Sequence, residues 1–181
     1  MKKILYIFLI AGLASAVISC GSSGDSSGRS GASGTNANTS ENTTASSESL
    51  SGSGVFIVAG LSGNILRSTN KGASFDNATS STSNNLYGVS SDNSTFVVVG
   101  DNGTIVKSTD NGSSFDNATT STSNTLFGVG FGNNTFVAAG ISGTIVNSTD
   151  SGTTWDNATS PTANYLRDIV FGNNTFVAVG D

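Results

Sequence analysis

Short apolar runs separated by polar segments rich in Gly, Asn, Ser and Asp fill residues 55–181. In residues 84–123, for example, the pattern predicts four strands, at 86–90, 95–99, 104–108 and 113–116, followed by a polar connector from 118 to 123. Apolar runs of about five residues, bounded by turn-forming residues, are typical of β-strands. The pattern therefore predicts an all-β fold of short strands joined by tight turns.

The second of these strands is apolar at every position from Phe96 to Val99, and Ile105 and Val106 are adjacent in the third. A strand that is apolar on both faces has to be covered on both sides. Four-stranded sheets stacked face to face provide such cover, whereas a sheet with one solvated face does not.

The strand pattern repeats with a period of 40 residues. Residues 108–119 read STDNGSSFDNAT and return in closely related form at 148–159 and at 68–79. Four strands and three turns per period match one blade of a β-propeller. We expect a partial β-propeller of about three such blades, which is fewer than the four to eight blades of a closed ring. Three alternatives stay open: a fragment of a longer propeller, a ring completed by self-association, and an open stack.

Each copy of the repeated segment contains a predicted hairpin. A Gly follows two positions after an Asp or Asn, and an aromatic residue follows three positions after the Gly. Asx side chains accept backbone N–H groups in turns, Gly tolerates positive φ, and the aromatic ring is expected to pack under the hairpin. Because the same residues recur in every copy, we predict structural and not catalytic roles for them. They are Asn70, Gly72, Phe75, Asp110, Gly112, Phe115, Asp150, Gly152 and Trp155.

The segment Ser/Thr-x-Asp-x-Gly-x-Thr/Ser-Trp/Phe resembles the Asp-box, or bacterial neuraminidase repeat. With its Leu-x-Gly-Val, Phe-Val-x-x-Gly and Gly-x-Ile-Val-x-Ser-Thr-Asp segments, the stretch 55–181 looks closest to the photosystem II stability/assembly factor-like propellers. The resemblance implies a β-propeller that makes protein–protein contacts. The first copy departs from the motif at Asn70.

The first 54 residues have a different character. Lys2 and Lys3 precede an apolar run at 4–18, which is too short to span a membrane and fits a signal peptide at 1–19. Residues 17–20, Val-Ile-Ser-Cys, resemble a bacterial lipobox, which implies that Cys20 carries a diacylglycerol after cleavage. An ordinary secretory signal with an incidental Cys is the alternative. The Ser/Gly/Thr/Asn-rich stretch that follows, up to residue 54, has one large apolar residue and is predicted to be a flexible, disordered linker.

Composition narrows the function further. The sequence contains no His and one Cys, which argues against the usual zinc and thiol sites, so no metal or cofactor is expected. A net charge of −5 argues against a nucleic-acid partner. Resemblance to sialidases implies an arginine triad and a Tyr nucleophile assisted by a Glu. Residues 55–181 contain only Arg67 and Arg167 and no Glu, so we expect no enzymatic activity.

The copies differ most in the first strand of the unit. Tyr87 and Phe127 give way to Arg167, and the Gly that follows them gives way to Asp168. Tyr165, Arg167 and Asp168 are therefore candidate ligand contacts, with a local Arg–Asp pair or a solvated strand end as the alternative. The sequence favours a lipid-anchored protein of the bacterial cell envelope, at the outer membrane, with a non-catalytic binding or scaffold domain for a protein or glycan. A fragment of a sialidase-like or glycan-binding surface protein is the rival hypothesis.

Overall fold

The computed structural model describes residues 54–181. The predicted signal peptide, Cys20 and nearly all of the predicted linker lie outside these residues. No helix in the described part is long and apolar enough to cross a membrane.

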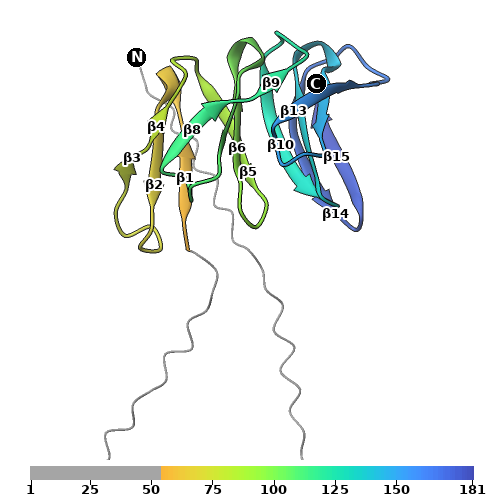
Figure 1. The fold of residues 1–181 in the computed structure, drawn as a ribbon. Coiled ribbons are helices and arrows are strands. Elements are labelled where there is room, and N and C mark those ends of the chain that lie inside the picture. The colour runs from red at the N-terminus through yellow and green to blue at the C-terminus, as the bar shows by residue number, and fades with distance from the viewer. Residues whose placement is uncertain (1–53) are drawn as a thin grey trace, which may run out of the picture. The chain divides into compact units, whose positions relative to one another are not determined.

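The described residues form a succession of mainly antiparallel sheets, seen in sequence order from orange to blue in Figure 1. This confirms the all-β prediction. The first sheet contains β1 (Phe56–Ala59), β2 (Ile65–Ser68) and β3 (Asp76–Asn77). The second contains β5 (Leu86–Ser91), β6 (Phe96–Gly100), β7 (Ile105–Ser108) and β8 (Ser114–Asn117). The third contains β10 (Leu126–Gly132), β11 (Thr135–Gly140), β12 (Ile145–Ser148) and β13 (Thr154–Ala158), and the last contains β14 (Leu166–Gly172) and β15 (Thr175–Gly180).

We call these four sheets blades one to four. In blades one to three a 3₁₀ turn follows the second strand of the repeat, at η1 (Leu61–Gly63), η2 (Asp101–Gly103) and η3 (Ile141–Gly143). The predicted strands of blade two agree with the observed ones to within one residue at each end.

The predicted polar connector is more ordered than its composition suggested. It contains β9 (Thr119–Thr120), which pairs in parallel with β13 of blade three, where Thr119 faces Thr154 and Thr120 faces Trp155. One period earlier, β4 (Thr79–Ser80) pairs with β8 of blade two in the same way. Each connector therefore adds a short outer strand to the blade that follows it.

The hydrophobic core lies between the blades. Val98 of β6 packs in a cluster with Ile57 and Phe115, which joins blades one and two. Val97 and Val99 pack in a second cluster that contains Phe136 and Trp155 and joins blades two and three. A third cluster, which includes Val137, Ala139, Leu166 and Ile169, joins blades three and four. The consecutive valines of β6 are all fully buried, since neighbouring side chains pack against opposite neighbouring blades.

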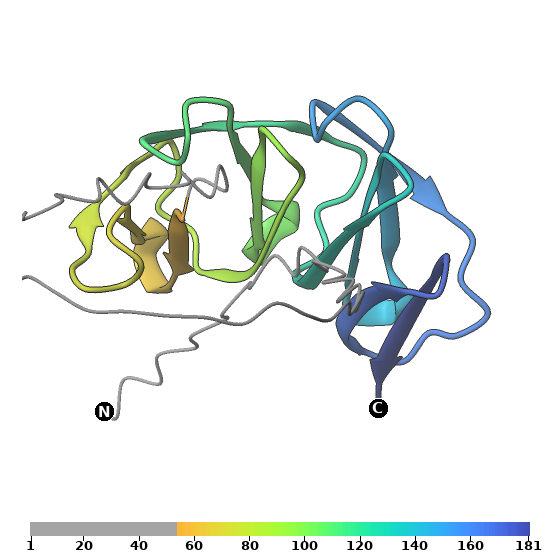
Figure 2. The ribbon, with the colours of Figure 1, turned by 90° about the horizontal axis from the view of Figure 1, so that it is seen from below.

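The first strands of blades two, three and four, β5, β10 and β14, lie side by side. Figure 2 shows the same succession of blades from below. Two glycines permit this close approach: a Cβ on Gly88 would lie 2.7 Å from the carbonyl oxygen of Phe127, and one on Gly128 would lie 2.8 Å from the Cα of Asp168.

Candidate binding surface

Each of the three first strands contains a β-bulge at the same place. In blade two, Leu86 pairs with Gly100 and Gly88 with Val99, so Tyr87 is left without a partner across the strand. Phe127 in β10 and Arg167 in β14 occupy the same position. Bulges re-aim a side chain and are over-represented next to functional sites. We call Tyr87, Phe127 and Arg167, together with the adjoining Tyr165, the bulge row.

The side chains of the bulge row contact one another across three blades. The ring centroids of Tyr87 and Phe127 are 5.6 Å apart, and those of Phe127 and Tyr165 are 6.5 Å apart, with tilted planes in both pairs. The Cζ atom of Arg167 lies 5.3 Å from the Phe127 centroid and 5.2 Å from that of Tyr165. A guanidinium group within about 6 Å of a ring centroid gains cation–π stabilisation.

Asp101, in η2, holds one end of the row. Its carboxylate accepts hydrogen bonds from the Tyr87 hydroxyl at 3.0 Å, from the Asn85 amide at 2.9 Å and from the Thr125 hydroxyl at 3.2 Å. Burial and the hydrogen bond to Asp101 raise the pKa of Tyr87. Because Thr125 belongs to the next period, Asp101 also ties blade two to blade three.

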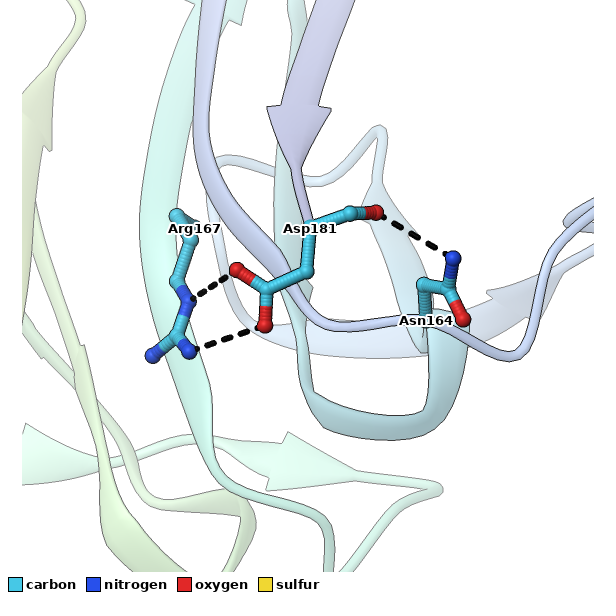
Figure 3. Close-up of polar contacts among 3 residues, drawn as sticks. All are labelled: Asn164, Arg167 and Asp181. Carbon is cyan, nitrogen blue, oxygen red and sulfur yellow. Dashed lines mark hydrogen bonds and ion pairs between the residues drawn. The ribbon is translucent and has the colours of Figure 1, made fainter.

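Asp181 holds the other end. It lies two periods after Asp101, and its carboxylate accepts hydrogen bonds from Nε and Nη2 of Arg167 at 3.2 and 3.0 Å (Figure 3). The same contact raises the pKa of Arg167 and lowers that of Asp181. The side chain of Asn164 donates to the backbone oxygen of Asp181 at 3.2 Å. Arg167 thus pairs with Asp181 and not with its neighbour Asp168, whose Oδ1 accepts the N–H of Ile169 at 2.8 Å.

The residues of the repeated hairpins lie apart from the bulge row in the blade, after the third strand. In blade two, Asn111 and Gly112 have φ of 64° and 79°. Oδ1 of Asp110 accepts the N–H groups of Ser113 and Ser114 at 2.9 and 3.0 Å. Positive φ at both central residues and an Asx acceptor are the features of the turn expected there.

The other two hairpins have the same geometry. Asp150 Oδ1 accepts the N–H groups of Thr153 and Thr154, and Gly152 has φ of 77°. Asn70 accepts the N–H of Ser74 at 3.0 Å through its amide oxygen, next to Gly72 with φ of 84°.

The aromatic residues of the hairpins differ in burial. Phe115 and Trp155 are 1% and 2% exposed, because each packs against the blade that precedes its own. Phe75, in contrast, is 40% exposed. Its hairpin belongs to blade one, the first of the blades that the structure describes, so no preceding blade covers the ring there.

Two hairpin carboxylates are tightly held. The hydrogen bond from the Thr154 N–H lowers the pKa of Asp150 to about 2, helped by the hydroxyls of Thr154 and Ser148. The hydroxyl of Ser114 is the main cause of the lowered pKa of Asp110. Because these oxygens serve the turn, they are poorly placed to act as acids or bases. Within residues 54–181, no group of three or more His, Cys, Asp or Glu side chains is arranged to hold a metal ion.

Three residues of the bulge row and its ends were not predicted as ligand contacts from the sequence. Tyr165, Arg167 and Asp168 were predicted as ligand contacts, whereas Tyr87, Phe127 and Asp101 were not. Tyr87 and Phe127 could have been found from the 40-residue period, because they occupy the positions equivalent to Arg167 in the two preceding copies. The period does not point to Asp101, because the equivalent position one period later is Ile141.

Comparison with known proteins places the fold. No family model and no curated protein matches the sequence. A solved structure of YCF48 bound to a D1 peptide matches with a TM-score of 0.58 at 17% identity. The match covers 70% of this chain and 43% of that chain, so this chain spans less than half of its length. The likeness confirms the predicted propeller fold and its similarity to a photosystem II assembly factor at the level of fold.

Proposed function

We propose that the protein is a membrane-anchored, extracytoplasmic lipoprotein whose residues 55–181 act as a non-catalytic binding or scaffold module. The bulge row is the observation that carries the proposal. The core and hairpin residues repeat from blade to blade, while the row presents a different side chain from each blade on one continuous surface. Tyr, Phe and Arg clusters of this kind are typical of protein interfaces.

The polar groups of the described residues support binding over catalysis. Asp110 and Asp150 serve their hairpins, and Arg67 donates through Nε to the carbonyl of Asn111 at 2.7 Å. A raised pKa makes the Tyr87 phenolate, which a sialidase-like nucleophile needs, harder to form. YCF48, which shares the fold, has been solved with a bound peptide, and this supports a polypeptide partner over a glycan.

Binding can be tested on envelopes from cells that express the full chain. Cross-linking followed by purification should capture a partner with the natural chain, and the Arg167→Ala variant should capture less of it. The Lys71→Ala variant is the matched control, because Lys71 is an exposed cation in blade one, outside the bulge row. Equal capture by all three chains would contradict the proposal, and so would release of fluorophore from a fluorogenic sialoside.

The anchor that we propose is a lipid on Cys20, which holds the domain at the outer membrane. Acyl chains contribute about 0.8 kcal/mol per buried CH₂, and a second chain makes anchoring stable. Cys20→Ala should abolish labelling by radioactive palmitate and release the chain from sedimented membranes. Ser22→Ala, two residues away, should leave both unchanged. Labelling that persists in Cys20→Ala would refute the anchor while leaving the binding proposal intact.

A further inference from the structure

We propose that the bulge row binds an extended polypeptide segment that carries basic side chains at alternate positions. This inference rests on the proposed binding function and names the partner of that same surface.

The spacing of the rings suits an extended chain. Successive centroids along the row are 5.6 and 6.5 Å apart. Alternate side chains of a β-strand lie about 6.6–6.8 Å apart on the same face. A segment laid along the row can therefore place every second side chain against a successive ring.

The charge around the rings favours a cation. Asp101 and Asp181 hold the two ends of the row and Asp168 follows Arg167 in β14, so the row and the residues beside it carry three carboxylates and one guanidinium. Residues 54–181 as a whole contain nine Asp, no Glu and four Lys or Arg. An acidic segment would be repelled, whereas a basic one gains both long-range attraction and contact with the ring faces.

Arg167 is an example, within the chain itself, of a cation bound by the rings of this surface. Its guanidinium lies 5.3 and 5.2 Å from two ring centroids of the row, while a carboxylate pairs with its edge. A basic side chain of a ligand would find the same two elements, a ring and a nearby carboxylate, at Tyr87 with Asp101. One Asp101 oxygen accepts from the Tyr87 and Thr125 hydroxyls and the other accepts from Asn85, which leaves a carboxylate with about four acceptor sites room for one further donor.

The row is held in place before any ligand arrives. The bulges project the side chains, and hydrogen bonds to Asp101 and Asp181 fix both ends. Binding to a pre-organised surface costs less ordering of side chains. A pre-organised row of rings suits a segment that is itself extended.

The test uses fluorescence anisotropy with the full chain and three labelled seven-residue peptides. The first has the sequence SKSKSKS, the second has the same composition as SSKKKSS, and the third has Glu in place of Lys in the alternating order. At roughly physiological ionic strength, where the screening length is about 8 Å, the alternating Lys peptide should bind best. We expect the clustered peptide to bind roughly fivefold more weakly, from two displaced ring contacts, and the Glu peptide not to bind.

Variants locate the binding. Phe127→Leu and Tyr165→Leu keep an apolar side chain and remove the ring, so each should weaken binding of SKSKSKS roughly two- to fivefold. Phe75→Leu is the matched control, since it removes an exposed ring outside the row, and it should bind like the natural chain. Emission from Trp155, the only Trp and 2% exposed, reports whether each variant is folded.

Several results would overturn the inference. Equal affinity for the alternating and clustered peptides would show attraction to charge alone. Equal weakening by Phe75→Leu would show that the row is not the site, and binding of neutral oligosaccharides in competition with the peptide would point to a glycan surface. If a partner captured from envelopes depends on Arg167 while SKSKSKS does not bind, the proposed function stands and this inference fails.

Discussion

Asp150 and Asn70 occupy the same place in two hairpins, and only Asp150 titrates. Asn70 accepts the Ser74 N–H at 3.0 Å and donates to the Ser74 hydroxyl at 2.8 Å, while Asp150 accepts both the N–H and the hydroxyl of Thr154. The turn therefore needs an acceptor at this position and does not need a charge. The amide is accommodated because the Ser74 hydroxyl accepts a hydrogen bond from it, whereas the Thr154 hydroxyl donates one to the Asp150 carboxylate.

This difference gives a pH prediction. The pKa of Asp150 is about 2 in the folded protein and about 3.9 in an unfolded chain. The ionised carboxylate therefore stabilises the fold above about pH 4, and this contribution is lost as the pH falls towards 2. Asp150→Asn should fold at pH 7 and lose less free energy of unfolding than the natural chain between pH 4 and pH 2.5, measured in urea. Equal losses in both chains would contradict the assignment.

The glycines of the first strands give a steric prediction. A Cβ on Gly128 would lie 2.8 Å from Asp168 Cα and 2.9 Å from Ile169 N, which are backbone atoms that cannot rotate away. Gly128→Ala should lower the free energy of unfolding by about 1–3 kcal/mol through overpacking. Gly172→Ala, where a Cβ meets nothing within 4 Å, should change it by no more than about 0.5 kcal/mol. Thermal unfolding followed by circular dichroism compares the two, and similar effects would argue against close strand approach.

At the scale of elements, the aromatic residue of one hairpin packs into the hydrophobic cluster that its blade shares with the blade before it. Phe115 is 1% exposed and Phe75, one period earlier, is 40% exposed. Phe115→Ala should cost about 3–5 kcal/mol, as expected for a buried Phe, and Phe75→Ala should cost less, about 1–2 kcal/mol, because that residue is already partly exposed. Denaturant titrations read by Trp155 emission provide the measurement. Comparable losses at the two positions would show that Phe75 is covered in solution.

The sequence predicted the elements that are encoded locally. The valines of β6 and the Asn111–Gly112 turn could be placed from apolar runs and turn residues, and the 40-residue period extended them to the other copies. The strand β9 could not be predicted, because two Thr residues carry no apolar alternation and pair only through the backbone of the next blade. The exposure of Phe75 was missed for a related reason. It depends on which blades lie beside the hairpin, and the repeated motif contains no information about neighbouring blades.

The bulge row marks the limit of sequence reasoning at the candidate site. Arg167 stood out because it replaces an aromatic residue in the pattern, but its carboxylate partner is fourteen residues away, at Asp181. The bulge that projects Tyr87 depends on the register between β5 and β6, which no single strand encodes. Contacts that join three blades become visible only when the blades are placed side by side.

At the scale of the whole molecule, the exposed side of blade four presents an apolar face. Val170, Val177 and Val179 are 57%, 50% and 56% exposed. One period earlier, Val137 and Ala139 stand in the places of Val177 and Val179 and are buried in the cluster shared with Leu166 and Ile169 of blade four. The valine face thus has the composition of an inter-blade surface, and contiguous exposed apolar patches mark interaction sites.

We expect a second copy of the chain to cover this valine face as the concentration rises. Sedimentation velocity on the full chain carrying Cys20→Ala should show association. Changing Val177 and Val179 together to Ser should weaken it roughly tenfold, because each Val is only about half exposed, full burial of a Val side chain contributes about 1.5 kcal/mol or more, and 1.4 kcal/mol is a factor of ten. Leu61→Ser is the matched control, as Leu61 is 51% exposed in η1, outside the valine face. Association that both changes weaken equally would reflect non-specific aggregation. A chain that stays monomeric at every concentration would contradict self-association, and a different partner would then have to cover the valine face.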